Sequence, residues 1–147
     1  ARMVDVSAKV DSIRQATART SILISDDCTL QLTEDSTSEI IRTARIAGIQ
    51  AAKQTAHLIP MCHQINLKSV TVDIALDRGQ SAFHVLVTSK ASDVTGVEME
   101  AMVGASVAGL TIYDMVKAVD PAAVILRTEV LEKSGGKTGH WQRPESN

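Results

Sequence analysis

Apolar and polar residues alternate strictly along residues 69–77, SVTVDIALD. Valine, isoleucine or leucine occupies every second position there, a spacing typical of a β-strand with one face in the core. Residues 78–80 read Arg-Gly-Gln and favour a turn, and the alternation resumes over 81–89. The pattern therefore predicts an antiparallel hairpin. Similar alternation predicts further strands over 122–132 and, more weakly, over 19–25.

Two other segments repeat their apolar residues with the period of an α-helix. The first covers 39–57; Ser36 and Glu39 have the spacing of a capping box, and Pro60 lies beyond its end. The second covers 97–119 and is stopped by the Asp-Pro pair that follows. We therefore expect two long helices, each placed between strands.

The predicted elements follow one another in the order β-α-β-β-α-β. This order favours an α+β ferredoxin-like fold, in which an antiparallel sheet carries both helices on one face. No repeat, linker or low-complexity segment interrupts the pattern, so we expect a single domain over residues 1–147. The polar tail from about His140 is expected to fray or to lie on a neighbouring molecule.

The second predicted helix is apolar in every direction around its axis, which predicts burial on all sides. Its alanines and glycines form a small-residue stripe, and we expect a second subunit to pack closely against it. Asp114 and Lys117 are unusual there; they could form an ordinary i, i+3 ion pair at a solvated helix end, or act in catalysis. Glu100 shares their face but lies roughly 21 Å from Asp114, so the two would belong to different composite sites on an oligomer.

Composition excludes several classes of function. The net charge is −2 and only 2% of residues are aromatic, so the chain lacks the basic face and stacking platforms of nucleic-acid binders. The longest apolar run, 101–113, is well short of the ~20 residues that a membrane span needs. Cys28 and Cys62 have no CxxC spacing and predict reduced thiols. We therefore expect a cytoplasmic protein with no nucleic-acid or membrane partner.

Further candidate groups lie on predicted connections. His63, in LIPMCHQ, suits proton transfer near neutral pH, although a lone loop histidine is more often a surface residue. No metal site is predicted there, because Cys62 is adjacent and no other ligand has helical spacing to His63. The segment KSGGKTG, 133–139, has the composition of a phosphate-holding loop or of a flexible surface loop. The basic residues that could surround a multiply charged anion are Arg14, Lys53, Lys117, Lys133 and Lys137.

Several segments of the chain occur together in one known family. In chain order they are MVDVSAK at 3–9, ARIAGIQAAKQT at 44–55, LIPMCH at 58–63, TGVEMEA at 95–101, LTIYDMVKAVD at 110–120 and KSGGKTG at 133–139. Together they resemble the cyclic pyranopterin monophosphate synthases of molybdenum cofactor biosynthesis, the accessory-protein C family. The resemblance runs from residue 3 to about residue 139.

This resemblance implies a lyase that converts 3′,8-cyclo-7,8-dihydro-GTP to cyclic pyranopterin monophosphate and pyrophosphate. It implies no resident cofactor, although Mg²⁺ could accompany the triphosphate of the substrate. It also implies a ferredoxin-like subunit assembled as a homohexamer, a trimer of dimers, with active sites between subunits. The partner of the protein would then be this small cyclised nucleotide and further copies of the chain.

The resemblance assigns roles to individual residues by motif. Asp114 would be the catalytic acid or base, and Lys117 a catalytic lysine one turn later. The residues expected to contact the substrate or its phosphates are Met61, Cys62, His63, Glu98 and Met99, with Arg14, Lys53, Glu100 and Lys133 in support.

One position departs from the family pattern. The family usually has Lys-Gly-Asp just before the ARIAGI helix, with a lysine important to activity, whereas this chain has Thr37, Ser38 and Glu39. The group that would replace this lysine stays open. A nonenzymatic nucleotide-binding protein or inactive paralogue is therefore an alternative, and an oligomer whose charges form only interface pairs is a third.

Overall fold

The structure, a computed structural model, describes residues 1–145. Its strands are β1 (Ser12–Leu23), β2 (Leu67–Asp77), β3 (Ala82–Asp93), β4 (Val124–Ser134) and β5 (Trp141–Gln142). Its helices are α1 (Asp26–Gln31), α2 (Glu34–Lys53), α3 (Thr55–Leu58) and α4 (Glu98–Val116).

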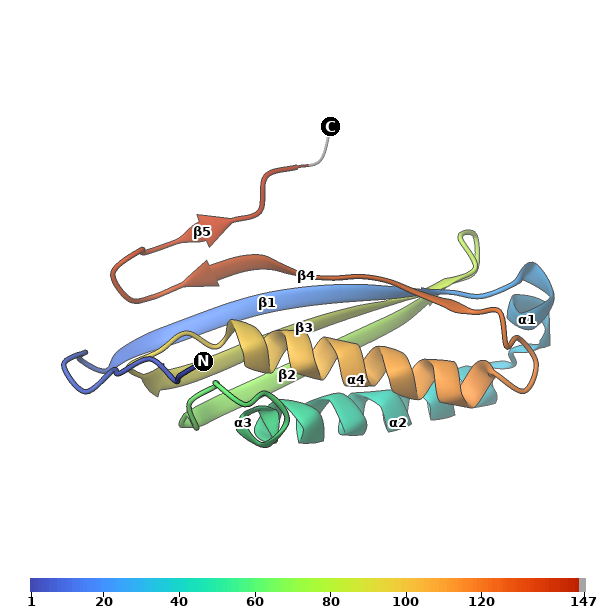
Figure 1. Cartoon of the computed structure of the whole chain (residues 1–147). Helices are drawn as coiled ribbons and strands as arrows, with labels where there is room; N and C mark the ends of the chain where they lie inside the picture. Colours follow the sequence, from blue (N-terminus) through green and yellow to red (C-terminus); the bar gives the residue numbers. More distant parts are fainter. Residues whose placement is uncertain (146–147) are drawn as a thin grey trace.

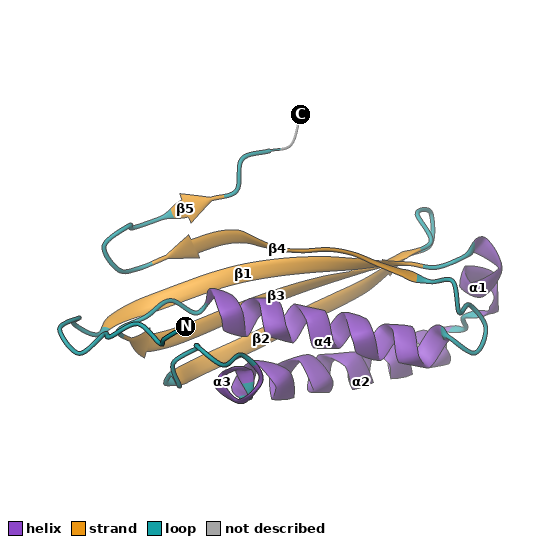
Figure 2. Ribbon diagram, in the orientation of Figure 1, coloured by secondary structure: helices purple, strands orange, loops and turns teal. Residues whose placement is uncertain are grey.

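The strands form an antiparallel sheet in the order β2-β3-β1-β4-β5, and the two long helices α2 and α4 lie side by side on one face (Figures 1 and 2). The first four strands and these helices give the ferredoxin-like arrangement that the sequence predicts. The fifth strand is an addition, because the tail predicted to fray from His140 turns back and pairs with β4. Trp141 lies opposite Lys133 in this pairing.

The core lies between the sheet and the two long helices. Val72 and Ile74 of β2 and Phe83, Val85 and Val87 of β3 are buried, which confirms the alternation predicted for the hairpin. Within residues 1–145, the other face of the sheet carries no helix (Figure 2). The fold therefore has two layers, with one surface of the sheet left open.

The two long helices approach each other closely where Gly48 of α2 faces Gly104 of α4. A Cβ atom on Gly48 would lie 3.0 Å from the carbonyl oxygen of Gly104, and one on Gly104 would lie 3.1 Å from that of Gly48. Neither position therefore has room for a larger side chain. The small-residue stripe of α4 is covered by α2 and by the sheet of the same chain, so the expectation that a second subunit covers it is wrong.

The prediction that the second helix is buried on all sides is also wrong for its C-terminal half. Leu110 is 57% exposed and Asp114 is exposed as well, whereas Glu100, near the start of the helix, is buried. The sheet and α2 cover two sides of α4 and leave a third side open. Because Glu100 is covered and Asp114 is not, the two acidic residues have different environments as well as different positions.

The limits of some elements differ from those predicted. Helix α2 begins at Glu34 rather than 39, because Thr33 and not Ser36 is its N-cap. The Thr33 hydroxyl accepts from the Ser36 amide at 3.1 Å, and the Thr33 amide donates to the Ser36 hydroxyl at 2.9 Å. The predicted helix 39–57 divides into α2 and the short α3, since the chain turns at Gln54.

The first strand is longer than predicted. It begins at Ser12 rather than 19. Ala16 and Ala18, in its first half, are buried in the core, but they are too small to show a strong apolar alternation in the sequence. Strands β3 and β4 likewise extend past the predicted 81–89 and 122–132. These added residues bring Arg14 and Lys133 to the same end of the sheet, where they enter the site described next.

Candidate active site

Most of the predicted substrate residues gather around the N-terminus of α4. Residues 98–100 begin this helix, and the connection after α3 brings residues 61–63 against it, so that both groups line a hollow of about 360 Å³. The N-terminal segment closes the hollow with Arg2, Val4 and Lys9. Glu98, Met99, Glu100, Met61, Cys62 and His63 are thus brought together as the sequence predicts.

A second hollow of about 190 Å³ adjoins the first, and Glu98 and Lys9 line both. Arg14 lines the second hollow and is held there, because its guanidinium donates at 3.0 and 3.1 Å to two backbone carbonyl oxygens at the end of β3. Lys133 Nζ donates to Glu98 Oε1 at 2.8 Å. The predicted phosphate contacts Arg14 and Lys133 therefore lie beside the predicted substrate contacts.

The KSGGKTG segment folds over Arg14. Gly135 and Gly136 have φ values of 96° and 71°, a region that favours glycine. A Cβ atom would collide with the Ile13 carbonyl oxygen at Gly135 and with the Arg14 guanidinium at Gly136. These glycines allow the loop to line the second hollow, which agrees with either a phosphate-holding loop or a surface loop.

A third hollow of about 510 Å³ lies next to the second and is lined by Glu98, Lys133, Thr138, His140 and Trp141. Sequence reasoning missed the last two, because the polar tail was expected to fray. The signal that could have found them is the presence of the only tryptophan of the chain just after a glycine-rich turn. The three hollows that share Glu98 are called the Glu98 site below.

Two carboxyl groups of the Glu98 site differ in their protonation. Burial alone would raise the pKa of Glu98, but the hydrogen bond and charge of Lys133 and the charge of Arg14 hold it below its ordinary value. Glu100 is only 3% exposed, and its burial, with the charges of Glu98 and Asp93, raises its pKa to about 7. Near neutral pH, Glu98 is therefore an ionised acceptor, whereas Glu100 holds its proton in a large share of molecules.

His63 has a defined tautomer in this environment. Its Nε2 lies 2.7 Å from the backbone carbonyl oxygen of Val4, and since a carbonyl oxygen can only accept, Nε2–H is the donor. Nδ1 is then the ring atom that can accept a proton. The neighbouring Cys62 is poorly suited to act as a nucleophile, because burial and the charge of Glu100 raise the pKa of its thiol.

Asp114 and Lys117 do not lie in the Glu98 site. Their side chains form an ion pair at 2.6 Å, with 69% of the Asp114 side chain and 55% of the Lys117 side chain exposed. This is the i, i+3 pair at a solvated helix end that the spacing allows. The hydrogen bond and charge of Asp114 raise the pKa of Lys117, so the lysine of the isolated chain is a stable cation.

Thr37 lies at the same end of the helical layer as Asp114 and Lys117, because α2 begins where α4 ends (Figure 1). Its hydroxyl donates to the carbonyl oxygen of Thr33 at 2.7 Å and so belongs to the first turn of α2. Lys53, at the other end of α2, lines a separate hollow of about 420 Å³ that adjoins the Glu98 site through Ile65.

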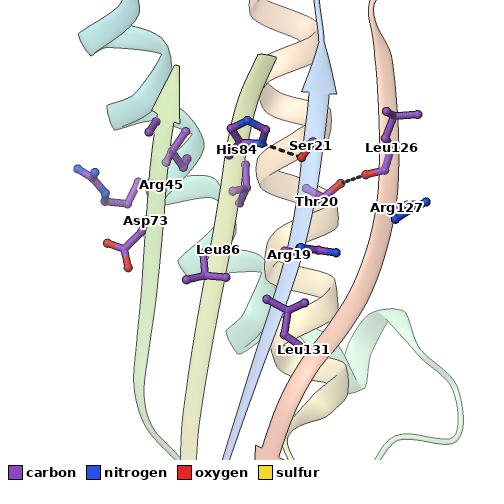
Figure 3. Close-up of a pocket in the computed structure, with 13 residues that line it drawn as sticks. Arg19, Thr20, Ser21, Arg45, Asp73, His84, Leu86, Leu126, Arg127 and Leu131 are labelled. Carbon is purple, nitrogen blue, oxygen red and sulfur yellow. Dashed lines mark hydrogen bonds between the residues drawn. The ribbon is translucent and has the colours of Figure 1, made fainter. Parts of the chain in front are cut away.

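A further hollow of about 730 Å³ lies on the open face of the sheet (Figure 3). Arg19, Arg45, Arg127 and His84 line it, and none of the predicted site residues does. Its arginines are partly engaged, since Arg19 pairs with Glu129 at 2.7 Å and Arg45 donates to a backbone carbonyl oxygen of β2 at 3.0 Å. This surface is therefore distinct from the Glu98 site.

Comparison with known proteins identifies the family of the chain. A family model described as the MoaC family matches residues 3–136. The chain belongs to the MoaC family. The matched range contains every residue of the Glu98 site except Arg2, Thr138, His140 and Trp141.

Relatives in the MoaC family are similar over nearly their whole length. The chain is 42% identical to the cyclic pyranopterin monophosphate synthase of Geobacillus thermodenitrificans, over 97% of this chain and 91% of that protein. It is 46% identical to the protein of the same name from a Nocardioides species, over 98% and 90%, and 44% identical to that of Chloroflexus aurantiacus, over 98% and 90%.

Among solved structures, a designed protein with a ferredoxin fold has a TM-score of 0.44 and 17% sequence identity, over 90% of this chain and 95% of that one. The ferredoxin-like assignment made above depends on the strand order and not on this likeness. Within the part of the chain that the structure describes, no helix combines the length and the apolar character needed to cross a membrane.

Proposed function

We propose that this member of the MoaC family is a cyclic pyranopterin monophosphate synthase, acting in molybdenum cofactor biosynthesis. Its substrate would be 3′,8-cyclo-7,8-dihydro-GTP, and its products cyclic pyranopterin monophosphate and pyrophosphate. The observation that carries the proposal is the pair Glu98 and Glu100, whose pKa values are moved in opposite directions beside the cations of Arg14 and Lys133. The names of relatives that are 42% to 46% identical support it.

The reaction needs both the two carboxyl groups and the two cations. The purine-derived ring must open and close again as a pterin, which requires a proton donor and a proton acceptor. Glu100 is suited to donate a proton and Glu98 to accept one, and His63 Nδ1 is a further acceptor. In the second half, a sugar hydroxyl attacks the α-phosphate: the new O–P bond forms, the bond to pyrophosphate breaks, and the hydroxyl proton passes to a base. Arg14 and Lys133 would stabilise the charge of the departing pyrophosphate.

Asp114 and Lys117 would act in a site completed by another subunit. Asp114 lies roughly 21 Å along α4 from Glu100, and Lys117 lies almost one turn farther, too far for one small substrate to reach both ends within a chain. We propose a homohexamer, a trimer of dimers, in which the C-terminal end of α4 from one subunit meets the Glu98 site of another. The open face of the sheet supports further association, because Leu86 and Leu126 are exposed there beside a hollow.

The protein would act in the cytoplasm, in agreement with its two free cysteines. We expect no resident cofactor, and any Mg²⁺ would arrive with the triphosphate of the substrate. The proposal is tested by incubating purified protein with the cyclised nucleotide and measuring the two products. Asp114→Asn and Lys117→Ala should abolish product while the assembly measured by light scattering is retained, and turnover that survives both substitutions would contradict their role.

A mixing experiment tests whether the site is shared. Asp114→Asn and Lys133→Ala remove groups at opposite ends of one chain, so each protein alone should be inactive. If each site combines one end from each of two subunits, hexamers assembled from an equal mixture should regain about a quarter of the wild-type sites. A mixture that stays inactive after subunit exchange would place both groups in a site of one chain and contradict the shared site.

Thr37 favours one other function, a nonenzymatic nucleotide-binding protein. The motif that usually supplies a lysine here supplies a hydroxyl bonded to its own helix turn. Binding of the cyclised nucleotide without turnover would support this second function. Thr37→Lys should then restore product formation, whereas an active wild-type enzyme that is unaffected by this substitution would show that the lysine is replaced by another group.

A further inference from the structure

Trp141 has no evident structural role, unlike the other two aromatic residues of the chain. Phe83 is completely buried in the core, and the Tyr113 hydroxyl donates to the Pro121 carbonyl oxygen at 2.9 Å. Trp141 is 37% exposed on the two-residue strand β5, and its indole N–H bonds to no residue within 1–145. A large aromatic side chain is therefore left partly open in a protein that contains very few of them.

The position of Trp141 in the sheet directs it toward the Glu98 site. It lies opposite Lys133, and residues directly opposite each other in an antiparallel pair point to the same face. Lys133 in turn lies opposite the buried Ala16 of β1 and reaches Glu98 on α4, so this is the face that carries the helices. Trp141 and Lys133 accordingly line the third hollow together.

Contacts of Arg143 hold the segment around β5 against β4. Its backbone amide donates to the Leu131 carbonyl oxygen at 2.7 Å, and its Nε donates to the Val130 carbonyl oxygen at 2.6 Å. Its guanidinium lies 5.8 Å from the centre of the Trp141 ring, within the range of a cation–π contact. The indole is thus positioned before any ligand arrives, which reduces the entropy lost on binding.

The third hollow joins this aromatic surface to the cationic second hollow. Glu98, Lys133 and Thr138 line both, and Arg14 lies on the far side of the second. A ligand with a flat ring and several phosphates would fit this sequence of surfaces, since rings stack on an indole and phosphates bind guanidinium and ammonium groups. A volume of about 510 Å³ is within the range of small-molecule sites.

We propose that Trp141 is a specificity-determining residue that stacks on the planar ring system of the guanine-derived nucleotide, while the phosphates lie against Arg14 and Lys133. The inference rests on the proposed function for the identity of the substrate. It adds a contact from the C-terminal hairpin, outside the range matched by the family model. On binding, the ring would lie in the third hollow beside Glu98, with the phosphates in the second; Glu100 and His63, which line the first hollow, would not yet contact it.

Fluorescence can test this stacking directly, because Trp141 is the only tryptophan. The wild-type protein is titrated with GTP and, separately, with inorganic tripolyphosphate, which has the phosphates without the ring. N-acetyltryptophanamide corrects for light absorbed by the nucleotide. We expect saturable quenching by GTP and little by tripolyphosphate, although tripolyphosphate should compete with GTP. Equal quenching by both, or none by either, would overturn the stacking.

Kinetics of substituted proteins provide the second measurement. Trp141→Ala should raise KM for the cyclised nucleotide about 10- to 100-fold, as expected for loss of a stacked base, with a smaller change in kcat. Trp141→Phe, which retains a ring, should stay within a few-fold of wild type. Gln142→Ala is the matched control on the same strand and should leave KM unchanged; an equal effect there would mean that only strand pairing matters.

The two proposals fail in different ways. If the protein forms no product but GTP still quenches Trp141, the stacking stands and the proposed reaction does not. If turnover is normal and Trp141→Ala leaves KM unchanged, the reaction stands and the stacking is wrong. Loss of the hexamer in Trp141→Ala without a change in GTP affinity would assign Trp141 to a subunit interface and also overturn the proposal.

Discussion

The burial of Glu100 makes the stability of the protein depend on pH in a defined direction. Its pKa rises from an ordinary value of 4.5 to about 7 in the folded chain, chiefly because its carboxyl group is removed from water. Between these two values the unfolded chain loses the proton while the folded chain keeps it. The folded state therefore binds more protons, and the free energy of unfolding must fall as pH rises through this window.

The size of the effect follows from the same two values. At 1.36 kcal/mol for each tenfold change in proton affinity, the move from 4.5 to about 7 amounts to about 3 kcal/mol. Glu100→Gln replaces the carboxyl with a neutral group of the same shape, so it removes this contribution. Relative to wild type, the variant should be equally stable near pH 4.5 and more stable by up to about 3 kcal/mol near pH 8.

Urea unfolding at pH values from 4.5 to 8, followed by circular dichroism, measures this difference. Glu145→Gln is the matched control, because it removes the same charge from an exposed position. The difference between Glu100→Gln and wild type should grow with pH, and that for the control should not. Parallel curves for all three proteins would refute the reasoning, since they would mean that Glu100 ionises in the folded state as readily as in water.

Two further substitutions test the packing of the helices. Gly48→Val should lower the free energy of unfolding in urea by about 1–3 kcal/mol, because its branched side chain has no room against the Gly104 carbonyl oxygen; an unchanged midpoint would contradict the close approach. Thr33→Ala should cost about 1 kcal/mol through loss of the N-cap of α2, while Glu39→Ala should cost much less. The opposite ranking would support the capping box of Ser36 and Glu39 that the sequence predicts.

Hydrophobic periodicity predicts the fold well here because each element has one strongly apolar face. Val72, Val85 and Val87 mark two strands without ambiguity, and the element order then leaves few topologies. Periodicity fails where buried residues are small or where polar residues cap a helix. Ala16 and Ala18 gave β1 too weak a signal over its first half, and Thr33 competes with Ser36 as a cap of similar chemistry.

The partners of the small-residue stripe could not be predicted from one helix alone. Gly104 shows that a backbone approaches closely, but not from which chain, and the approaching residue is Gly48 of the same chain. The Glu98 site likewise could not be predicted from any one segment alone. Motifs identify Glu98, His63 and Lys133 separately, whereas their common location depends on strand pairing that a pattern does not encode.

The two acidic positions of α4 support function on different grounds. A buried carboxyl such as Glu100 opposes folding above its ordinary pKa. Within residues 1–145 no lysine or arginine is among the groups that shift this pKa, so packing alone gives no reason for a glutamate there. Asp114 makes an exposed pair with Lys117, which stabilises a helix end only weakly. The physical cost at Glu100 therefore indicates function by itself. A role for Asp114 depends on the family motif and on a neighbouring subunit. The mixing experiment tests whether that subunit contributes to the site.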